Sequence, residues 1–461
     1  MTDSRIVTLL LVNCAALLER ADESLLPAVY DEVGRAFRIS PSQLGSLTFI
    51  RGLVQALASP LAAYLALTHS RIHVVAIGAF AWGVATAALG LCTAFWQAAV
   101  VKIFNGIGLA IVVPAIQSIV ADMHEEHERG LGFGFLHATG QLGVILGGIF
   151  ATVLAGQGTI LGIDGWRFAF LNVALISVVL GFALLSFANV NDNVKHLVNR
   201  IRDGQKLITN DLENNAPMEE DGLWELWKGT RQVLLVPTFQ VIVAQGIVGQ
   251  TPWYAMAFFT LWFELLGFKN SQAAFLAAML SVGNMFGSVF GGWIGDLAAK
   301  HLPNSGRIIC SHFSAAVGIP LSAVLLLLIP QDVTYGWLYG IILFLMGFLM
   351  SWNSPATNWP IFAEIVPQKL HTTVYAVDLA LEKSISALGT PLVGILAERL
   401  FGFSTASAFR PDAKNARALA EGVFCLVAVP FSLCLVVISI LYWTYPKDRD
   451  RARKETSSDL D

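Results

Sequence analysis

Four ionisable residues lie within five positions of an apolar stretch near the N-terminus: Glu19, Arg20, Asp22 and Glu23. Each charge placed at mid-depth in a bilayer costs roughly 2.5–3.5 kcal/mol, so these side chains must face a cavity or one another. On a helix Glu23 can reach Arg20 at i,i+3, which leaves Glu19 as the better candidate for reversible protonation. Two interpretations stay open: a proton-coupling cluster, or a static ion cluster that fixes helix packing.

Other cations and amides interrupt later apolar stretches of the first half. Arg51 and Gln55 lie one turn apart, and Lys102 lies in a further stretch. An anionic group on a ligand would suit Arg20, Arg51 and Lys102 jointly, although Lys102 could equally extend its charge to a membrane interface.

Acids recur near the end of the second half, where Asp378 and Glu382 are spaced i,i+4 and Lys383 follows. The acids either join a translocation path or pair with Lys383 for structural reasons. Amides and indoles elsewhere in this half can orient a polar ligand without burial of a charge, although helix packing or interfacial anchoring explains any one of them as well. We expect a ligand site formed by Arg51, Gln55, Lys102, Gln117, Gln245, Gln250, Trp253, Asn353, Asn358, Asp378 and Glu382.

Long apolar helices must position these groups. Of the 461 residues, 55% are hydrophobic and only 13% are charged, against roughly 25% charged in soluble domains. Stretches long enough to span a bilayer recur along the chain. The predicted spans are 6–30, 43–68, 72–94, 97–121, 131–157, 167–189, 235–265, 271–298, 308–330, 334–359, 372–400 and 419–445.

A polar segment divides these twelve spans six plus six. We predict an N-terminal bundle at 1–190, a cytoplasmic linker at 191–232, a C-terminal bundle at 233–446 and a cytoplasmic tail at 447–461. The linker includes an amphipathic stretch near Leu223. Lys and Arg are enriched in the loops that would be cytoplasmic if both termini are cytoplasmic, although the loop before the last span departs from this bias.

The two halves repeat a motif at the ends of their fourth spans. Gln117 precedes Asp122 in the first half, as Asn358 precedes Glu364 in the second. Paired repeats around a central site are a common construction of transporters.

A second set of motifs suggests a gate at the helix ends. Gly292 and Asp296 end one span and Arg307 follows, so the carboxylate can pair with this arginine or cap a neighbouring helix. The first-half counterpart lacks the glycine and the acid, but Asp122 and Arg129 could form a pair of their own. We therefore expect a gate of Asp122, Arg129, Asp296, Arg307 and Glu364; a loop that only sets topology is the alternative.

These features together resemble the major facilitator superfamily over nearly the whole chain. The Gly292-x-x-x-Asp296 loop with its trailing arginine looks like the signature loop of that family, and Lys102-x-x-x-Gly106-x-Gly108 is similar to its fourth-helix pattern. The Glu19-Arg20 pair, followed by Leu25-Leu26-Pro27, resembles Spinster-type members, in particular a plant and algal branch. The resemblance implies an all-α polytopic membrane protein with 12 transmembrane helices in two six-helix bundles.

The resemblance also implies a function. Spinster-like proteins are associated with proton-linked export of lysolipids and sphingolipids, and their first-helix acid and arginine are implicated in coupling. This chain has Glu19 where Asp is more usual and Leu109 where many relatives have Glu. A water-soluble organic anion is therefore the competing substrate class.

Composition and motifs limit the alternatives. The net charge of −4 shows no basic excess for nucleic acid, and neither a nucleotide-binding loop nor a catalytic or metal-binding pattern is evident. We expect a monomer in the plasma membrane or an endomembrane that is driven by a proton gradient and needs no cofactor. Its expected partners are a small-molecule or lipid substrate and membrane lipids. A receptor or scaffold that retains the transporter fold is the alternative to transport.

Overall fold

Each half of the chain forms a bundle of long helices. The computed structural model describes residues 3–39, 41–206, 222–256, 258–386, 389–404 and 412–458. The first half comprises α1 (Asp3–Ala28), α2 (Tyr30–Phe37), α3 (Pro41–Ala58), α4 (Pro60–Thr68), α5 (Arg71–Leu91), α6 (Phe95–Met123), α7 (Arg129–Ala155) and α8 (Gly165–Lys206). A short antiparallel hairpin, β1 (Thr159–Ile160) with β2 (Ile163–Asp164), joins α7 to α8.

The second half begins with α9 (Gly222–Leu234), which packs against α4, α10 and α16. This helix confirms the helical stretch predicted near Leu223, while residues 207–221 lie outside the described part. The remaining elements are α10 (Pro237–Met256), α11 (Phe259–Leu265), α12 (Asn270–His301), α13 (Gly306–Ala323), η1 (Val324–Leu328), η2 (Val333–Tyr335), α14 (Gly336–Met350), η3 (Ser354–Asn358), α15 (Trp359–Glu364), η4 (Gln368–Leu370), α16 (His371–Ser386), α17 (Gly389–Arg399), α18 (Ala413–Ser439) and α19 (Leu441–Ser458).

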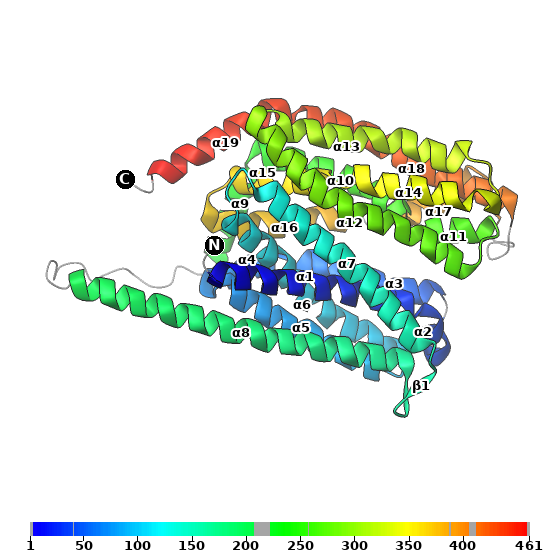
Figure 1. The fold of residues 1–461 in the computed structure, drawn as a ribbon, viewed down its shortest axis with the longest axis horizontal. Coiled ribbons are helices and arrows are strands. Elements are labelled where there is room, and N and C mark those ends of the chain that lie inside the picture. The colour runs from blue at the N-terminus through cyan, green and yellow to red at the C-terminus, as the bar shows by residue number, and fades with distance from the viewer. Residues whose placement is uncertain are drawn as a thin grey trace.

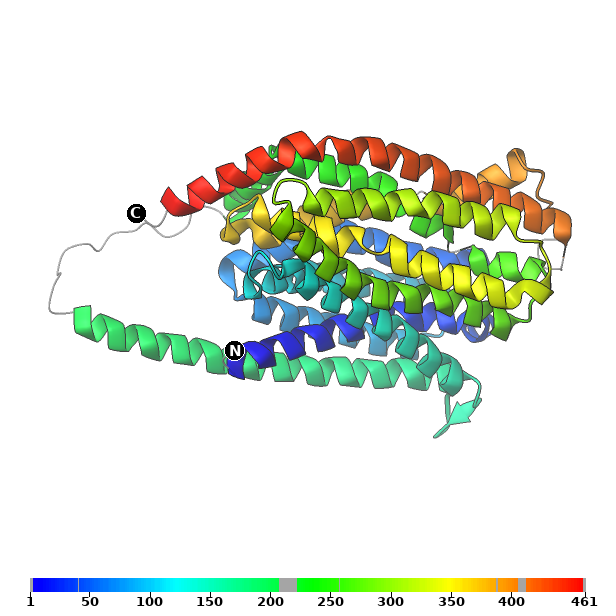
Figure 2. The ribbon, with the colours of Figure 1, turned by 45° about the horizontal axis from the view of Figure 1, so that its top comes forward.

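The helices of the two halves run side by side along one direction (Figures 1 and 2). The start of α1, the end of α19 and the far end of α8 lie at one end of the molecule, which we call the terminal end (Figure 1). The β1–β2 hairpin marks the opposite end, the hairpin end. An even number of crossings places both chain ends on the same side.

Eight described helices are long and apolar enough to cross a membrane. The number rises to ten if two bent segments each count as one span: α3 followed by α4, and α9 followed by α10–α11. The two other predicted spans are α1 and α16 with α17. These contain the ionisable clusters around Glu19 and Asp378, which reduce their mean hydropathy. In α1 the charges are too many for a uniformly apolar span, whereas α16 with 16 residues and α17 with 11 are each shorter than one full span.

Two helices extend beyond the predicted boundaries. The sixth span was expected to end at 189, but α8 continues to Lys206, and α19 continues the last span to Ser458. No proline interrupts residues 187–206, so nothing in that segment removes a backbone donor from the helix.

Glycines let helices of the two halves cross closely at the terminal end. A Cβ atom at Gly292 of α12 would overlap the backbone carbonyl of Gly130 on α7, and one at Gly134 would meet the backbone of Ser288. Small residues permit this approach where larger side chains would separate the backbones. The α7–α12 crossing is thus a contact between the two halves.

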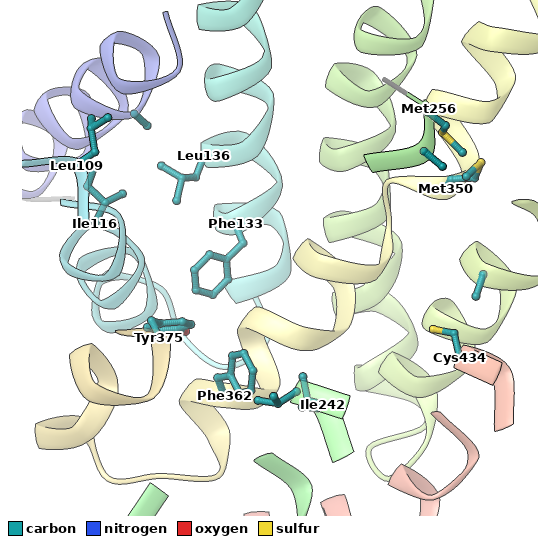
Figure 3. Packing of buried hydrophobic residues seen from close by; sticks show 14 of the residues in the cluster. Leu109, Ile116, Phe133, Leu136, Ile242, Met256, Met350, Phe362, Tyr375 and Cys434 are labelled. Carbon is teal, nitrogen blue, oxygen red and sulfur yellow. The ribbon is translucent and has the colours of Figure 1, made fainter. Parts of the chain in front are cut away.

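A buried apolar cluster joins both halves (Figure 3). Phe133 of α7 lies near Tyr375 of α16, with ring centroids 6.0 Å apart, and near Trp359 of α15 at 5.6 Å. Phe362 packs against Tyr375 at 6.0 Å. These four aromatic rings, the aromatic layer, connect the bundles through offset and edge contacts.

Candidate functional site

A cavity of about 360 Å³ lies between the two halves. Helices α1, α6 and α7 of the first half line it, opposite α10, α12, α14, η3, α15 and α16 of the second. Most of its lining side chains are polar, and those with polar atoms are Arg20, Glu23, Gln117, His137, Gln141, Gln245, Gln250, Trp253, Tyr254, Asn284, Ser351, Asn353, Ser354, Asn358, Trp359, Asp378, Glu382 and Lys383.

On the first-half wall, Glu23 is held between two guanidinium groups. Arg20 Nη1 donates to Glu23 Oε2 at 2.6 Å, and Arg51 Nη2 donates to Glu23 Oε1 at 2.6 Å. The expected i,i+3 contact of Arg20 with Glu23 is therefore confirmed. Charge-assisted bonds of this length fix both arginines, because each loses strong partners if it moves.

Glu19 lies behind this pair. Its carboxylate is 3.4 Å from Arg20 Nε and accepts a longer hydrogen bond, 3.5 Å, from Gln55 Nε2. Neither Glu19 nor Gln55 is among the cavity-lining residues. The expected proton carrier thus contacts the cavity only through Arg20.

Asp22 points the other way, into the first bundle. Its carboxylate accepts hydrogen bonds from Thr86 on α5 at 2.5 Å and from Asn105 on α6 at 3.2 Å. Asn105 also donates to Thr86 at 3.1 Å, so the three side chains form a closed network. This arrangement fixes α1 against α5 and α6.

Close packing explains which face of α1 reaches the cavity. Gly143 and Gly147 of α7 lie against the α1 backbone at Leu17 and Ala21, where a Cβ atom would overlap main-chain atoms. This contact sets the rotation of α1, which turns Arg20 and Glu23 to the cavity and Asp22 away from it.

The second-half wall carries amides and an acid pair. Gln245, Gln250 and Trp253 come from α10, while Asn353 precedes the π-helical turn η3 and Asn358 is its last residue. A π-helical turn widens the helix locally and is frequent at functional sites. On α16, Asp378, Glu382 and Lys383 face the same cavity.

The structure separates the predicted ligand residues into two groups. Eight line the cavity: Gln117, Gln245, Gln250, Trp253, Asn353, Asn358, Asp378 and Glu382. Arg51, Gln55 and Lys102 do not line it; Arg51 supports Glu23 from behind, and Lys102 is buried within the first bundle.

Several lining residues were absent from the predicted site. His137 and Gln141 of α7 are hydrogen-bonded to each other at 3.2 Å, and Tyr254, Asn284 and Lys383 come from the second half. An i,i+4 pair of polar side chains in an otherwise apolar span is a signal that could have identified His137 and Gln141.

At the terminal end, Asp296 of α12 connects the two halves. Its carboxylate accepts hydrogen bonds from the backbone N–H groups of Gly130 at 2.9 Å and Leu131 at 2.7 Å, at the first turn of α7. Arg307 Nη2 lies 3.0 Å from the same carboxylate. Asp296 therefore both caps a helix N-terminus and pairs with Arg307, the two alternatives that the sequence left open.

Arg307 extends this contact network. Its Nε lies 3.1 Å from Glu364 Oε1, and Nη2 donates to the backbone carbonyl of Glu126 at 2.9 Å. Tyr445 donates its hydroxyl to Glu364. We call Asp296, Arg307, Glu364 and Tyr445 the second-half latch.

The first half closes the terminal end differently from the prediction. Asp122 was expected to pair with Arg129, but it pairs with Arg71 at the start of α5 and lies 2.5 Å from His371 Nδ1. Arg129 Nε instead donates to the carbonyl of Ala121. The pairing was wrong because Arg71 also begins a helix beside Asp122, which spacing along the chain does not show. We call Arg71, Asp122 and His371 the first-half latch.

The aromatic layer and the two latches bring the halves together at the terminal end. Trp359 belongs both to the layer and to the cavity lining. Ser59 adds a contact between halves by donating to Ala376 O at 2.7 Å. Among the described residues, no group of three or more His, Cys, Asp or Glu side chains could hold a metal ion.

Comparison with known proteins identifies the family. The family model described as Major Facilitator Superfamily matches residues 12–390. The chain belongs to the Major Facilitator Superfamily. It is therefore a multi-pass integral membrane protein of a transporter family, with the twelve-span fold that the sequence predicted.

Relatives within the superfamily differ in what they carry. The chain is 23% identical over 372 residues to the probable sphingolipid transporter spinster homolog 3 of Arabidopsis thaliana, covering 77% of this chain and 68% of the relative. It is 20% identical to the phosphoglycerate transporter protein of Salmonella typhimurium, covering 78% and 76%. The probable L-galactonate transporter of Escherichia coli K12 is 26% identical over 173 residues, 37% of each chain.

Solved structures share the fold. A bacterial homolog of the human lysosomal transporter Spinster, inward-facing and unoccupied, aligns with a TM-score of 0.59 at 17% identity, covering 97% of this chain and 99% of that one. A proton:xylose symporter bound to a bromodeoxyglucose aligns with a TM-score of 0.63 at 15% identity, covering 93% and 95%. The expected Spinster-like resemblance is confirmed.

Proposed function

We propose that this major facilitator protein is a secondary active transporter, coupled to protons, of a small water-soluble organic anion that carries a carboxylate or phosphate group. The observation that supports the anion is the lining of the cavity. Arg20 and Lys383 face it from opposite halves, together with several amides and the acids Glu23, Asp378 and Glu382. Amides and two cations suit a compact anion, because they replace its hydration shell with fixed donors.

Lys383 is the cation most available to such an anion. Within the described part of the chain it makes no hydrogen bond or ion pair, whereas Arg20 already binds Glu19 and Glu23. Lys383 is half-buried, and an ammonium group without a partner in a cavity at membrane depth is costly, so an anionic ligand beside it gains affinity.

The contacts between halves support alternating access. Both latches and the aromatic layer lie on the terminal side of the cavity, so these contacts hold that side closed. We place the terminal end in the cytoplasm, on the basis of the loop lysines and arginines. The cavity would then load from the opposite side of the membrane and open to the cytoplasm when the latches separate.

Uptake into proteoliposomes tests the substrate class. We would compare labelled 3-phosphoglycerate, L-galactonate, cis,cis-muconate and glycerol 3-phosphate with a lysophospholipid and a sphingoid base. We expect saturable uptake of at least one anion, enhanced by an inward proton gradient, and none of the lipids. Lys383→Gln should reduce uptake at least tenfold, while Lys414→Gln, at an exposed site, should leave it unchanged.

Each other outcome identifies an alternative. Lipid movement without anion uptake would assign the cavity to the sphingolipid class carried by the spinster relatives. No flux of any probe, with binding retained, would favour a receptor or scaffold. Uptake that does not depend on the proton gradient would show that the protein is a facilitator without proton coupling.

A further inference from the structure

Buried charges around the cavity balance in the first half. Glu19, Asp22 and Glu23 provide three acids, and Arg20, Arg51 and Lys102 provide three bases, all within one bundle. Glu23 binds two of these bases directly. A set with equal numbers of opposite charges can remain fully ionised inside a membrane protein.

The charges on the second-half wall of the cavity do not balance. Its carboxylate and ammonium side chains in the cavity are Asp378, Glu382 and Lys383, two acids against one base. With all three ionised, this wall would carry one uncompensated negative charge at membrane depth. Burial of such a charge is costly, so a positive species must offset it.

The contacts of the acid pair point to a proton as that species. Asp378 is 8% exposed, and its Oδ1 atom has no hydrogen-bond partner in the described structure. Glu382, one helical turn away, is within hydrogen-bonding reach of Asp378 and Gln250. Two carboxylates this close disfavour each other's charge, while one shared proton lets one oxygen donate to the other.

We propose that Asp378 and Glu382 share one exchangeable proton and form the site of proton coupling, in place of Glu19. This inference rests on the proposed proton-coupled function. The proton is transferred from a hydronium ion in the cavity water to one carboxylate oxygen, which forms an O–H bond and leaves water behind. No other bond changes.

The proton would also control Lys383. When the pair is doubly ionised, its second negative charge attracts the adjacent ammonium group and competes with an anionic ligand for it. When the pair holds its proton, Lys383 is free to bind the anion. Proton and anion therefore bind cooperatively, and by linkage the anion promotes proton uptake, which is the requirement for symport.

Other charged groups act on the pair from neighbouring helices. The described ionisable groups that line the cavity with the pair are Arg20 and Glu23 of α1, His137 of α7, Tyr254 of α10 and Lys383 of α16 itself, while Arg51 of α3 supports Glu23 from behind. Arg20, Arg51 and Glu23 already bind one another, so they leave the extra charge of the acid pair unmatched.

Infrared difference spectroscopy tests the proton without knowledge of the substrate. Protein in nanodiscs would be titrated from high to low pH, and the C=O band of a protonated carboxyl group would be followed. We expect a band in the wild type that disappears in both Asp378→Asn and Glu382→Gln, because either change leaves one acid and one base. Lys383→Gln should increase it about twofold, since two unpaired acids then need two protons.

Matched variants separate this proposal from its rivals. The exposed Asp332→Asn should leave the band unchanged, and Glu19→Gln should not abolish it. A band lost only in Glu19→Gln would return the role to the first helix and overturn the proposal. The proposal would also be overturned if the wild type shows no C=O band of a protonated carboxyl group and its acid pair binds sodium instead. A band that behaves as expected in a protein that moves no anion would support the proton site while the transport function fails.

Discussion

The two halves of the molecule close the terminal end at equivalent positions with different chemistry. Glu364 ends the tenth span as Asp122 ends the fourth, and each pairs with an arginine that begins the preceding span of its half, Arg307 or Arg71. Both repeats therefore contain an acid–arginine pair at equivalent positions.

The halves differ in how they hold the opposite bundle. In the second-half latch, Asp296 bonds two backbone N–H groups of α7. The first half has no acid at the corresponding position, and His371 of α16 contacts Asp122 from the other bundle. A carboxylate on a helix N-terminus benefits from the helix dipole, whereas the histidine contact changes with protonation. The second-half latch should therefore contribute more to closure.

One set of measurements can test whether the second-half latch contributes more to closure than the first-half latch. Spin labels at Glu125 and His301, exposed positions on opposite halves at the terminal end, report the distance between the latch regions by double electron–electron resonance. The native cysteines would be replaced in that background. The fraction of protein in the closed distance population is then the readout for every variant.

The largest effect is expected from Gly292→Ala. The added methyl group would overlap the carbonyl oxygen of Gly130, a backbone atom that cannot move without separation of α7 and α12. We expect the closed population to vanish. Gly394→Ala is a matched control, because nothing lies within 4 Å of a Cβ atom there. A closed population that survives Gly292→Ala would show that this crossing does not limit closure.

Asp296→Asn should come next. It removes the buried charge that Arg307 and two backbone N–H groups bind, and loss of one partner of a buried ion pair costs about 3–5 kcal/mol. The closed population should fall by more than tenfold in the distance measurement. If the effect of Asp296→Asn is no larger than that of Asp122→Asn, the second-half latch does not contribute more to closure than the first-half latch.

Asp122→Asn should have a smaller effect, about 1–3 kcal/mol, because Arg71 is partly exposed and can be solvated when the pair is lost. Arg71→Gln should produce a similar shift, and Arg129→Gln a smaller one, since Arg129 binds a carbonyl of its own half. A larger shift from Arg129→Gln than from Arg71→Gln would favour the pair of Asp122 with Arg129 that the sequence suggested.

Tyr445→Phe is expected to change closure least. It deletes one hydroxyl that donates to Glu364 and leaves Arg307 in place. Loss of one hydrogen bond costs about 0.5–1.5 kcal/mol. The shift should be detectable only as a modest broadening of the distance distribution toward open values. Complete opening would show that Glu364 depends on Tyr445 rather than on Arg307.

Much of the fold and part of the site could be predicted from sequence. The length of the apolar stretches indicated the spans, and charges inside them singled out α1 and α16 as candidates for a functional or a structural role. The motif around Asp296 predicted both its arginine and its helix cap. His137 and Gln141 were missed because their polarity is modest, and Arg71 was missed because its partner lies 51 positions away.

The amino-acid sequence by itself determined that this chain must cross a membrane many times, that its halves repeat, and that buried ionisable groups gather in two spans. Lipid offers no partners for backbone or charge, so these conclusions need no coordinates. Only the tertiary structure decided which charges meet. Asp22 and Glu23 are neighbours in sequence, yet one binds Thr86 inside the bundle and the other faces the cavity. Helix rotation, set by the glycine contacts of α7, makes that choice.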